Sequence, residues 1–230
     1  MLQLEGLSFR QGGFHLTADW SVPKGARVAV IGPSGAGKST LLMALAGLVQ
    51  HDGRILWEGK DLAPLSPGDW PLSILFQDQN LFPHLTVTQN LGLGLSPRLR
   101  LAPADLSKID ATLERVGLSG MGGRKPGQLS GGQIGRAALA RALLRARPIL
   151  LLDEPFAALG PALKAEMLDL VAETADQSGA TVLMVTHDPA DALRFSDLVV
   201  LVADGVASPP QPTAALFADP PPALRAYLGR

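Results

Sequence analysis

Residues 32–40 combine a glycine-rich loop with a lysine and two hydroxyl side chains. The run Gly32-Pro33-Ser34-Gly35-Ala36-Gly37-Lys38-Ser39-Thr40 matches the pattern G-x-x-x-x-G-K-[S/T]. Glycines let the backbone curl so that successive N–H groups point at phosphate oxygens, and a helix beginning near Lys38 would add its positive end. Lys38 would reach the β- and γ-phosphates of a nucleotide, and the Ser39 hydroxyl would ligate Mg²⁺. The spacing therefore predicts a nucleotide-phosphate site.

Two adjacent carboxylates, Asp153 and Glu154, follow the apolar run 149–152. Neighbouring acids at the end of a buried strand are costly unless they face a cation or a reacting water. Asp153 suits the metal, and Glu154 suits the polarisation of an attacking water. The alternative is a pair of acids that begins a solvated loop, and the phosphate loop earlier in the chain argues against it.

A second candidate phosphate cradle follows Leu129, where Ser130-Gly131-Gly132-Gln133 begins a predicted helix. A serine and two glycines at a helix start form another site for an anion. One nucleotide rarely needs two such cradles from the same subunit. The simplest arrangement is a head-to-tail pair of identical chains that holds two nucleotides at its seam.

Composition excludes several other classes of protein. The chain has no cysteine, which removes disulfides, iron–sulfur clusters, thiolate zinc sites and cysteine nucleophiles. Its 20 basic and 21 acidic residues nearly cancel, and no basic patch is visible, so we expect no nucleic-acid partner. The apolar runs are too short to cross a bilayer, so we expect no membrane span. The first ten residues lack a basic region followed by an apolar one, so we expect no secretory signal.

Taken together, these motifs resemble those of ATP-binding-cassette (ABC) ATPases, the motor subunits of transporters, over essentially the whole chain. Residues 32–39 resemble the Walker A motif, 129–133 the family signature, and 149–153 with Glu154 the Walker B strand and catalytic glutamate. Gln77 resembles the Q-loop glutamine and His187 the switch histidine. The resemblance implies ATP and Mg²⁺ as cofactors. It also implies that Gln77 contacts Mg²⁺ and the attacking water, that His187 holds the γ-phosphate, and that the signature binds ATP across a dimer.

The elements that must position these residues alternate along the chain. Strands are expected at 2–9, 14–20, 27–31, 53–57, 73–76, 149–152, 181–185 and 198–202, and helices at 39–48, 103–116, 132–146, 161–175 and 189–195. The pattern predicts an α/β fold with a mixed, mostly parallel sheet, an N-terminal antiparallel portion and an inserted helical lobe. With the resemblance, we expect one ABC ATPase domain over 1–230. Its RecA-like core would span about 1–77 and 146–230, and its helical lobe about 78–145.

Residues 75–95 resemble, more narrowly, the ATP-binding subunits of bacterial thiamine importers. That resemblance implies a peripheral subunit on the cytoplasmic face of the bacterial inner membrane. It would energise uptake of thiamine or its phosphates through an integral membrane permease, with a periplasmic substrate-binding protein as an indirect partner. Leu81, Phe82 and Leu85 would line a groove for a permease helix or belong to the core of the lobe.

Several alternatives to a thiamine importer are open. The solute could be iron(III), sulfate or a polyamine, and the chain could be a soluble ABC ATPase that acts without a permease. A single copy of each motif argues against that second class. The signature argues against a P-loop nucleotide kinase. A non-hydrolysing regulatory cassette would not need both Glu154 and His187.

The chain departs from the family pattern at three places. One is Ile134 and Gly135, which follow the signature where polar arginine and glutamine are common. Gln11 stands where an aromatic residue usually stacks on adenine; Phe9 or Phe14 could substitute, but their alternation with polar residues favours a place in the core. Gly160 stands where the loop after Walker B usually has aspartate, which helps the two nucleotide sites communicate. We expect these changes to lower basal ATPase activity without abolishing it.

Overall fold

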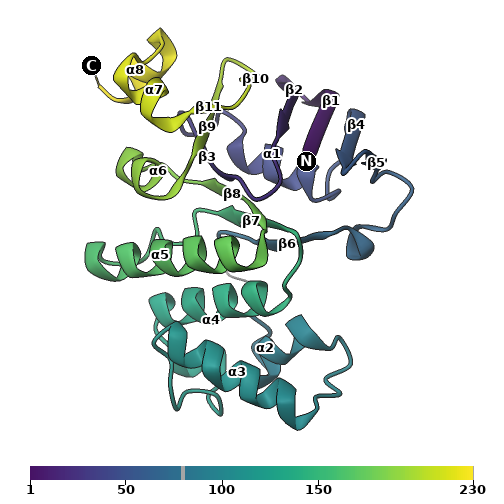
Figure 1. The fold of residues 1–230 in the computed structure, drawn as a ribbon, viewed down its shortest axis with the longest axis vertical. Coiled ribbons are helices and arrows are strands. Elements are labelled where there is room, and N and C mark those ends of the chain that lie inside the picture. The colour runs from purple at the N-terminus through teal and green to yellow at the C-terminus, as the bar shows by residue number, and fades with distance from the viewer. Residues whose placement is uncertain (79–80, 230) are drawn as a thin grey trace.

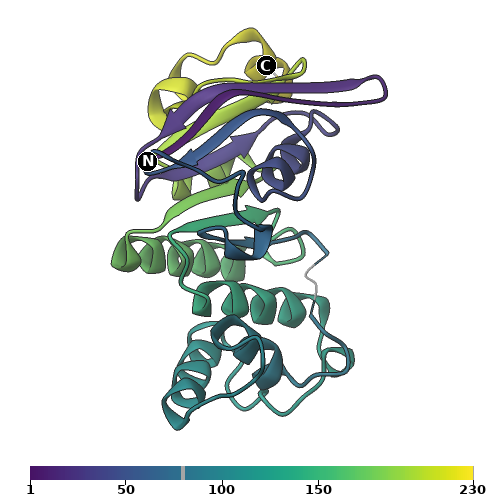
Figure 2. The same ribbon diagram turned by 90° about the vertical axis from the view of Figure 1, so that its right-hand side faces the viewer.

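The computed structural model describes residues 1–78 and 81–229 (Figures 1 and 2). Gln79 and Asn80, which belong to the segment 75–95, lie outside the described residues, as does Arg230. The strands are β1 (Leu2–Gln11), β2 (Phe14–Val22), β3 (Arg27–Ile31), β4 (Asp52–Trp57), β5 (Lys60–Asp61), β6 (Leu72–Leu75), β7 (Ile149–Asp153), β8 (Thr181–Val185), β9 (Leu198–Ala203), β10 (Val206–Ala207) and β11 (Gln211–Pro212). The α-helices are α1 (Lys38–Leu45), α2 (Val87–Leu95), α3 (Pro103–Arg115), α4 (Gly131–Leu144), α5 (Pro161–Ser178), α6 (Pro189–Phe195), α7 (Thr213–Ala218) and α8 (Pro222–Tyr227).

The strands form one mixed sheet in the order β5-β4-β1-β2-β10-β9-β3-β8-β7-β6, with β11 paired to β9. Strands β9, β3, β8, β7 and β6 run parallel, whereas the neighbouring pairs among β2, β1, β4 and β5 are antiparallel. Every residue of β7 and β8 is buried, as expected for parallel strands covered on both faces, whereas β2 alternates buried and exposed residues. The predicted fold class is confirmed.

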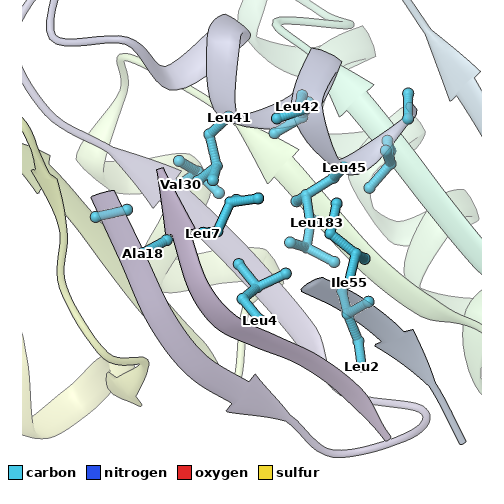
Figure 3. Packing of buried hydrophobic residues seen from close by; sticks show 14 of the residues in the cluster. Leu2, Leu4, Leu7, Ala18, Val30, Leu41, Leu42, Leu45, Ile55 and Leu183 are labelled. Atoms are coloured by element: carbon cyan, nitrogen blue, oxygen red, sulfur yellow. The ribbon is translucent and has the colours of Figure 1, made fainter. Parts of the chain in front are cut away.

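A large hydrophobic core lies between α1 and the β1–β2–β4 part of the sheet (Figure 3). Leu41, Leu42 and Leu45 of α1 are buried against this sheet. Val28 and Val30 of β3 belong to the same core. Since the strand before residues 32–37 and the helix after them are both anchored in one core, this loop is held at both ends.

A second core joins α4 to the opposite face of strands β7 and β8. It contains Ala137–Ala140 of α4, Leu150 and Leu152 of β7, and Met167 and Val171 of α5. Figures 1 and 2 both show α4 and α5 between the sheet and the pair α2–α3. This packing connects the helix that begins at residue 131 to the strand that ends at Asp153. The boundaries expected for a core and a lobe, at about 77 and 146, stay a prediction.

Sequence reasoning missed α2, because Gly92 and Gly94 weaken its helical pattern. The start of α2 is a capping box: the Thr86 hydroxyl accepts from the Gln89 N–H at 3.2 Å, and the Gln89 amide oxygen accepts from the Thr86 N–H at 2.9 Å. This T-x-x-Q pattern could have identified the helix. Gly94 is needed for packing, since a Cβ there would lie 2.6 Å from the Arg141 carbonyl oxygen of α4.

Candidate functional site

The phosphate loop runs from the end of β3 to the start of α1. Gly32, Gly35 and Gly37 have φ values of 148°, 77° and 102°, a region that residues with a side chain rarely adopt. Gly37 is the N-cap of α1, and no side chain caps the helix there. The first N–H groups of α1 are therefore available to an anion.

Lys38 lies across the loop that precedes it. Its ammonium group donates to the carbonyl oxygens of Gly32 at 2.9 Å and Pro33 at 2.8 Å. Burial lowers the pKa of Lys38, while the charges of Glu154 and Asp153 act in the opposite direction. The structure thus places a cation on the loop, close to the two acids.

Ser39 and Asp153, which the sequence analysis assigns to a metal site, are in direct contact. The Ser39 hydroxyl donates to the Asp153 carboxylate at 3.0 Å. Burial raises the pKa of Asp153, the Ser39 hydrogen bond lowers it, and the charge of Glu154 raises it further. A nearby cation would offset that cost of burial, because it favours the charged carboxylate.

Gln77 lines the same cavity as Ser39 and would add an amide oxygen. Hydroxyl, carboxylate and amide oxygens are the ligands that a hard cation such as Mg²⁺ prefers. Across residues 1–78 and 81–229 there is no cluster of three or more His, Cys, Asp or Glu side chains. The oxygens of Ser39, Asp153 and Gln77 are donors of the kind that fit Mg²⁺.

Glu154 and His187 are brought together by neighbouring parallel strands. Glu154 follows β7 and His187 follows β8, so both lie at the carboxyl edge of the sheet. The distance between His187 Nδ1 and a Glu154 carboxylate oxygen is 2.9 Å. Glu154 has a φ of 46°, an unusual backbone conformation for a non-glycine residue that costs roughly 1–2 kcal/mol. Strain of this kind is typical of functional positions.

These side chains surround a cavity of about 790 Å³. Its lining includes Lys38, Ser39, Thr40, Gln77, Glu154 and His187, together with Gly32, Ser34, Gly35 and Gly37. Pro33 and Ala36 lie elsewhere on the loop and line a neighbouring hollow. The volume is within the range of small-molecule sites.

The second predicted cradle does not line this cavity. The Ser130 hydroxyl accepts from the Gln133 N–H at 3.3 Å, and the Gln133 amide oxygen accepts from the Ser130 N–H at 2.9 Å, which makes a capping box at the start of α4. Ser130 and Gly131 are exposed, and Gly132 packs close to Leu159. The structure therefore leaves this segment at the surface, where another molecule can reach it.

Two phenylalanines meet at the edge of the cavity. Phe9 is buried in the core, as predicted, whereas Phe14 is only half-buried and packs against that core. Both line the cavity beside Gln11, with their ring centroids 6.0 Å apart. Phe14 also covers the phosphate loop, because a Cβ on Gly37 would lie 2.5 Å from its ring. Aromatic surface is thus available to a nucleotide base despite Gln11.

A polar network around His187 was not found from the sequence. The Lys164 ammonium group of α5 lies 2.7 Å from the Asp188 carboxylate and 2.8 Å from that of Asp191. The Thr186 hydroxyl donates to Asp191 at 2.7 Å. Both neighbours of His187 are therefore held by side-chain hydrogen bonds. The pairing spans 24 residues between Lys164 and Asp188, so no local pattern could reveal it.

Gly160 has an ordinary extended backbone, with a φ of −67° and a ψ of 159°, and open space around its Cα. It is the N-cap of α5 and offers no capping side chain. We expect Gly160→Asp to stabilise the protein by about 0.3 kcal/mol through capping, because glycine is itself a tolerated N-cap. We also expect ATP turnover of the assembled complex to rise about twofold or more, since the aspartate would restore communication between sites.

Gly160→Asn is the matched control, because asparagine caps the helix without adding a charge. Both variants should show a higher melting temperature, and only the aspartate should raise turnover. Unchanged turnover in Gly160→Asp would refute the expected link between this loop and catalysis.

The sheet, the phosphate loop between β3 and α1 and the acid pair after β7 together define a P-loop nucleotide-binding protein. The family model described as ABC transporter matches residues 16–157, and the chain belongs to this family. It is an ATP-binding ATPase subunit, as its motifs predicted. Family membership also excludes the nucleotide-kinase alternative. None of the helices in the described part of the chain is long and apolar enough to cross a membrane.

Similar proteins of known name align over nearly the full length. The thiamine import ATP-binding protein ThiQ of Cereibacter sphaeroides is 71% identical over 230 residues, covering 100% of both chains. ThiQ of a Ruegeria species is 58% identical over the same length, again covering 100% of both chains. Among solved structures, a dimer of the ATP-binding cassette MJ0796 in a post-hydrolysis state with ADP and Pi is 28% identical. Its TM-score is 0.82, over 93% of this chain and 99% of that one.

Proposed function

We propose that this chain is the ATP-hydrolysing subunit of an importer that takes up thiamine or its phosphates. The observation that carries the solute is the 71% identity to ThiQ over the whole length of both proteins. The observation that carries the chemistry is the arrangement of Lys38, Glu154 and His187 around one cavity. We place the subunit on the cytoplasmic face of the inner membrane, against a permease.

Within the site, each side chain has a separate role. Lys38 would move from the loop carbonyls to the β- and γ-phosphates, where its charge offsets theirs. Glu154 would accept a proton from the attacking water, and His187 would donate a hydrogen bond to the γ-phosphate. Ser39, Asp153 and Gln77 would hold Mg²⁺, which supplies Lewis-acid stabilisation of the phosphoryl oxygens.

The complete site requires a second copy of the chain. Ser130–Gln133 is absent from the lining of the cavity, although it forms a helix start of the type that binds anions. The MJ0796 cassette, which has the same fold, is dimeric. A head-to-tail dimer would bring the exposed signature of one copy to the nucleotide of the other. ATP would favour the closed dimer because its γ-phosphate contacts both copies.

The segment after Gln77 is suited to meet a permease. Phe82 is 47% exposed, and Leu81 and Leu85 are half-buried. Asn90, which is fully buried, holds this segment: its amide oxygen accepts from the Phe82 N–H at 2.7 Å, and its NH₂ donates to the Phe82, Leu85 and Thr86 carbonyls. Phe82 is thus an exposed aromatic side chain on a segment that Asn90 holds in place. Through Phe82, closure of the ATP-bound dimer would be transmitted to a membrane partner.

Transport itself tests this proposal, because the ATPase subunit does not contact the solute. The gene for this chain should be deleted in a strain that cannot synthesise thiamine. Uptake of labelled thiamine is then measured after the wild-type or a variant gene is reintroduced. We expect the wild-type gene to restore uptake and Phe82→Ala to lower it at least about tenfold while ATP hydrolysis by the isolated subunit stays normal. The exposed Leu65→Ala is the matched control and should transport normally. Restored uptake of iron(III), sulfate or a polyamine in place of thiamine would overturn the assignment.

A further inference from the structure

The C-terminal helix α8 ends with the only tyrosine of the chain, Tyr227. The Tyr227 hydroxyl donates a hydrogen bond of 2.5 Å to the backbone carbonyl of His187, 40 residues away in the sequence. Tyr227 also lines the cavity beside Glu154 and His187. None of the sequence motifs includes this residue, so its contact with the switch histidine is a finding of the tertiary structure.

We propose that Tyr227 is a positioning residue, which holds the His187 backbone so that the imidazole ring is presented to the γ-phosphate. This inference rests on the proposed role of His187 in ATP hydrolysis. Tyr227 would act through His187, with no proton transfer of its own. The C-terminal helix would thereby be part of the catalytic apparatus.

Packing alone does not hold the His187 ring, because its side chain is 60% exposed. Two hydrogen bonds restrain the residue in the structure. One joins its Nδ1 atom to Glu154, and the other joins its backbone carbonyl to Tyr227. On either side of His187, the Thr186 side chain is hydrogen-bonded to Asp191 and the Asp188 side chain to Lys164. With the tyrosine contact, three successive residues of this loop are each held by a hydrogen bond.

Helix α8 is well placed to act as a fixed support. Leu224 is fully buried in a third hydrophobic core with Ile31 of β3 and Val199 of β9. Strand β3 leads directly into the phosphate loop. Tyr227 and the loop are therefore anchored to the same strand, so the hydroxyl sets the position of His187 relative to the phosphates.

The surroundings of the Tyr227 hydroxyl favour its protonated form. Burial raises the pKa of Tyr227, and the charges of Glu154 and Asp188 raise it further. The group is therefore a permanent donor toward the His187 carbonyl.

Tyr227→Phe tests the proposal, because it removes the hydroxyl and keeps the ring. We expect kcat for ATP hydrolysis by the full-length protein to fall about 3- to 10-fold, the range that one hydrogen bond allows. KM for ATP should stay within about twofold, since the residues that bind the phosphates are unchanged. In a His187→Ala background, Tyr227→Phe should have no further effect on the residual rate, because the two residues act as one unit.

Leu228→Ala is the matched control. This neighbour is half-buried against the same core but makes no hydrogen bond to His187. It should lower the melting temperature and leave kcat unchanged. An equal loss of kcat in both variants, or additive effects of Tyr227→Phe and His187→Ala, would reduce Tyr227 to a packing role and overturn the proposal.

The experiment also separates this inference from the proposed function. A wild-type protein without ATP turnover would contradict the proposed function itself. An active wild-type protein with an equally active Tyr227→Phe variant would overturn only the role of Tyr227.

Discussion

Replacing Glu154 by glutamine is expected to lower the rate of ATP hydrolysis by about a hundredfold or more. Glutamine has nearly the same shape and can still contact His187, but it cannot accept a proton from the attacking water. Glu154 is positioned for that task after β7, where it lines the cavity and lies 2.9 Å from His187. The substitution changes only the side chain, so we expect residue 154 to keep its strained φ of 46°.

ATP binding should survive this change, because the phosphate loop and Lys38 are untouched. We expect the Glu154→Gln variant to bind ATP with near-normal affinity and to accumulate as an ATP-bound dimer. Three measurements on the same sample test this prediction. Nucleotide titration gives the affinity for ATP, phosphate release gives the rate of hydrolysis, and size-exclusion chromatography gives the molecular mass.

The exposed Glu166 of α5 offers the matched control, since Glu166→Gln makes the same chemical change away from the site. It should hydrolyse ATP at the wild-type rate. Full activity in Glu154→Gln would mean that another group accepts the proton, and the role of Glu154 would have to be reassigned.

Gly32→Ala should destabilise the protein by about 3 kcal/mol or more. A Cβ at this position would lie 2.0 Å from the Val202 carbonyl oxygen of β9, far inside contact distance. The obstacle is backbone in a strand that pairs with β3, so no side-chain rotation can relieve it. The φ of 148° adds a further conformational cost. Thermal and denaturant unfolding would measure the loss, and a shift of roughly 6–12 °C is expected.

Two other glycines separate the clash from the backbone effect. Gly35 has a φ of 77°, but a Cβ added there would have no neighbouring atom within 4 Å, so Gly35→Ala should cost only about 1–2 kcal/mol. Gly131 is exposed at the first turn of α4, has open space and does not have a positive φ, and Gly131→Ala should have little effect on stability. Equal losses of stability for Gly32→Ala and Gly35→Ala would show that β9 does not confine the phosphate loop.

The local parts of the site could be predicted from the amino-acid sequence. Residues 32–40 and the acid pair 153–154 are continuous segments, and their strand–loop–helix or strand–loop context depends on neighbouring residue types. Glycine conformations, apolar runs and helix caps act over a few residues, so they can be recognised without knowing the fold. The mixed sheet also followed from these short patterns. Helix α2 was missed because its two glycines weaken the helical pattern, although the capping box at its start is visible in the sequence.

Contacts between residues far apart in the sequence depend on the three-dimensional fold. The contact between Glu154 and His187 exists because β7 and β8 are adjacent parallel strands, and the contact between Tyr227 and His187 exists because α8 packs on β3 and β9. Phe14 covers the phosphate loop for a similar reason, through a β1–β2 hairpin that the sheet places beside it. Such contacts follow from strand order and from the packing of apolar faces, which no local spacing encodes.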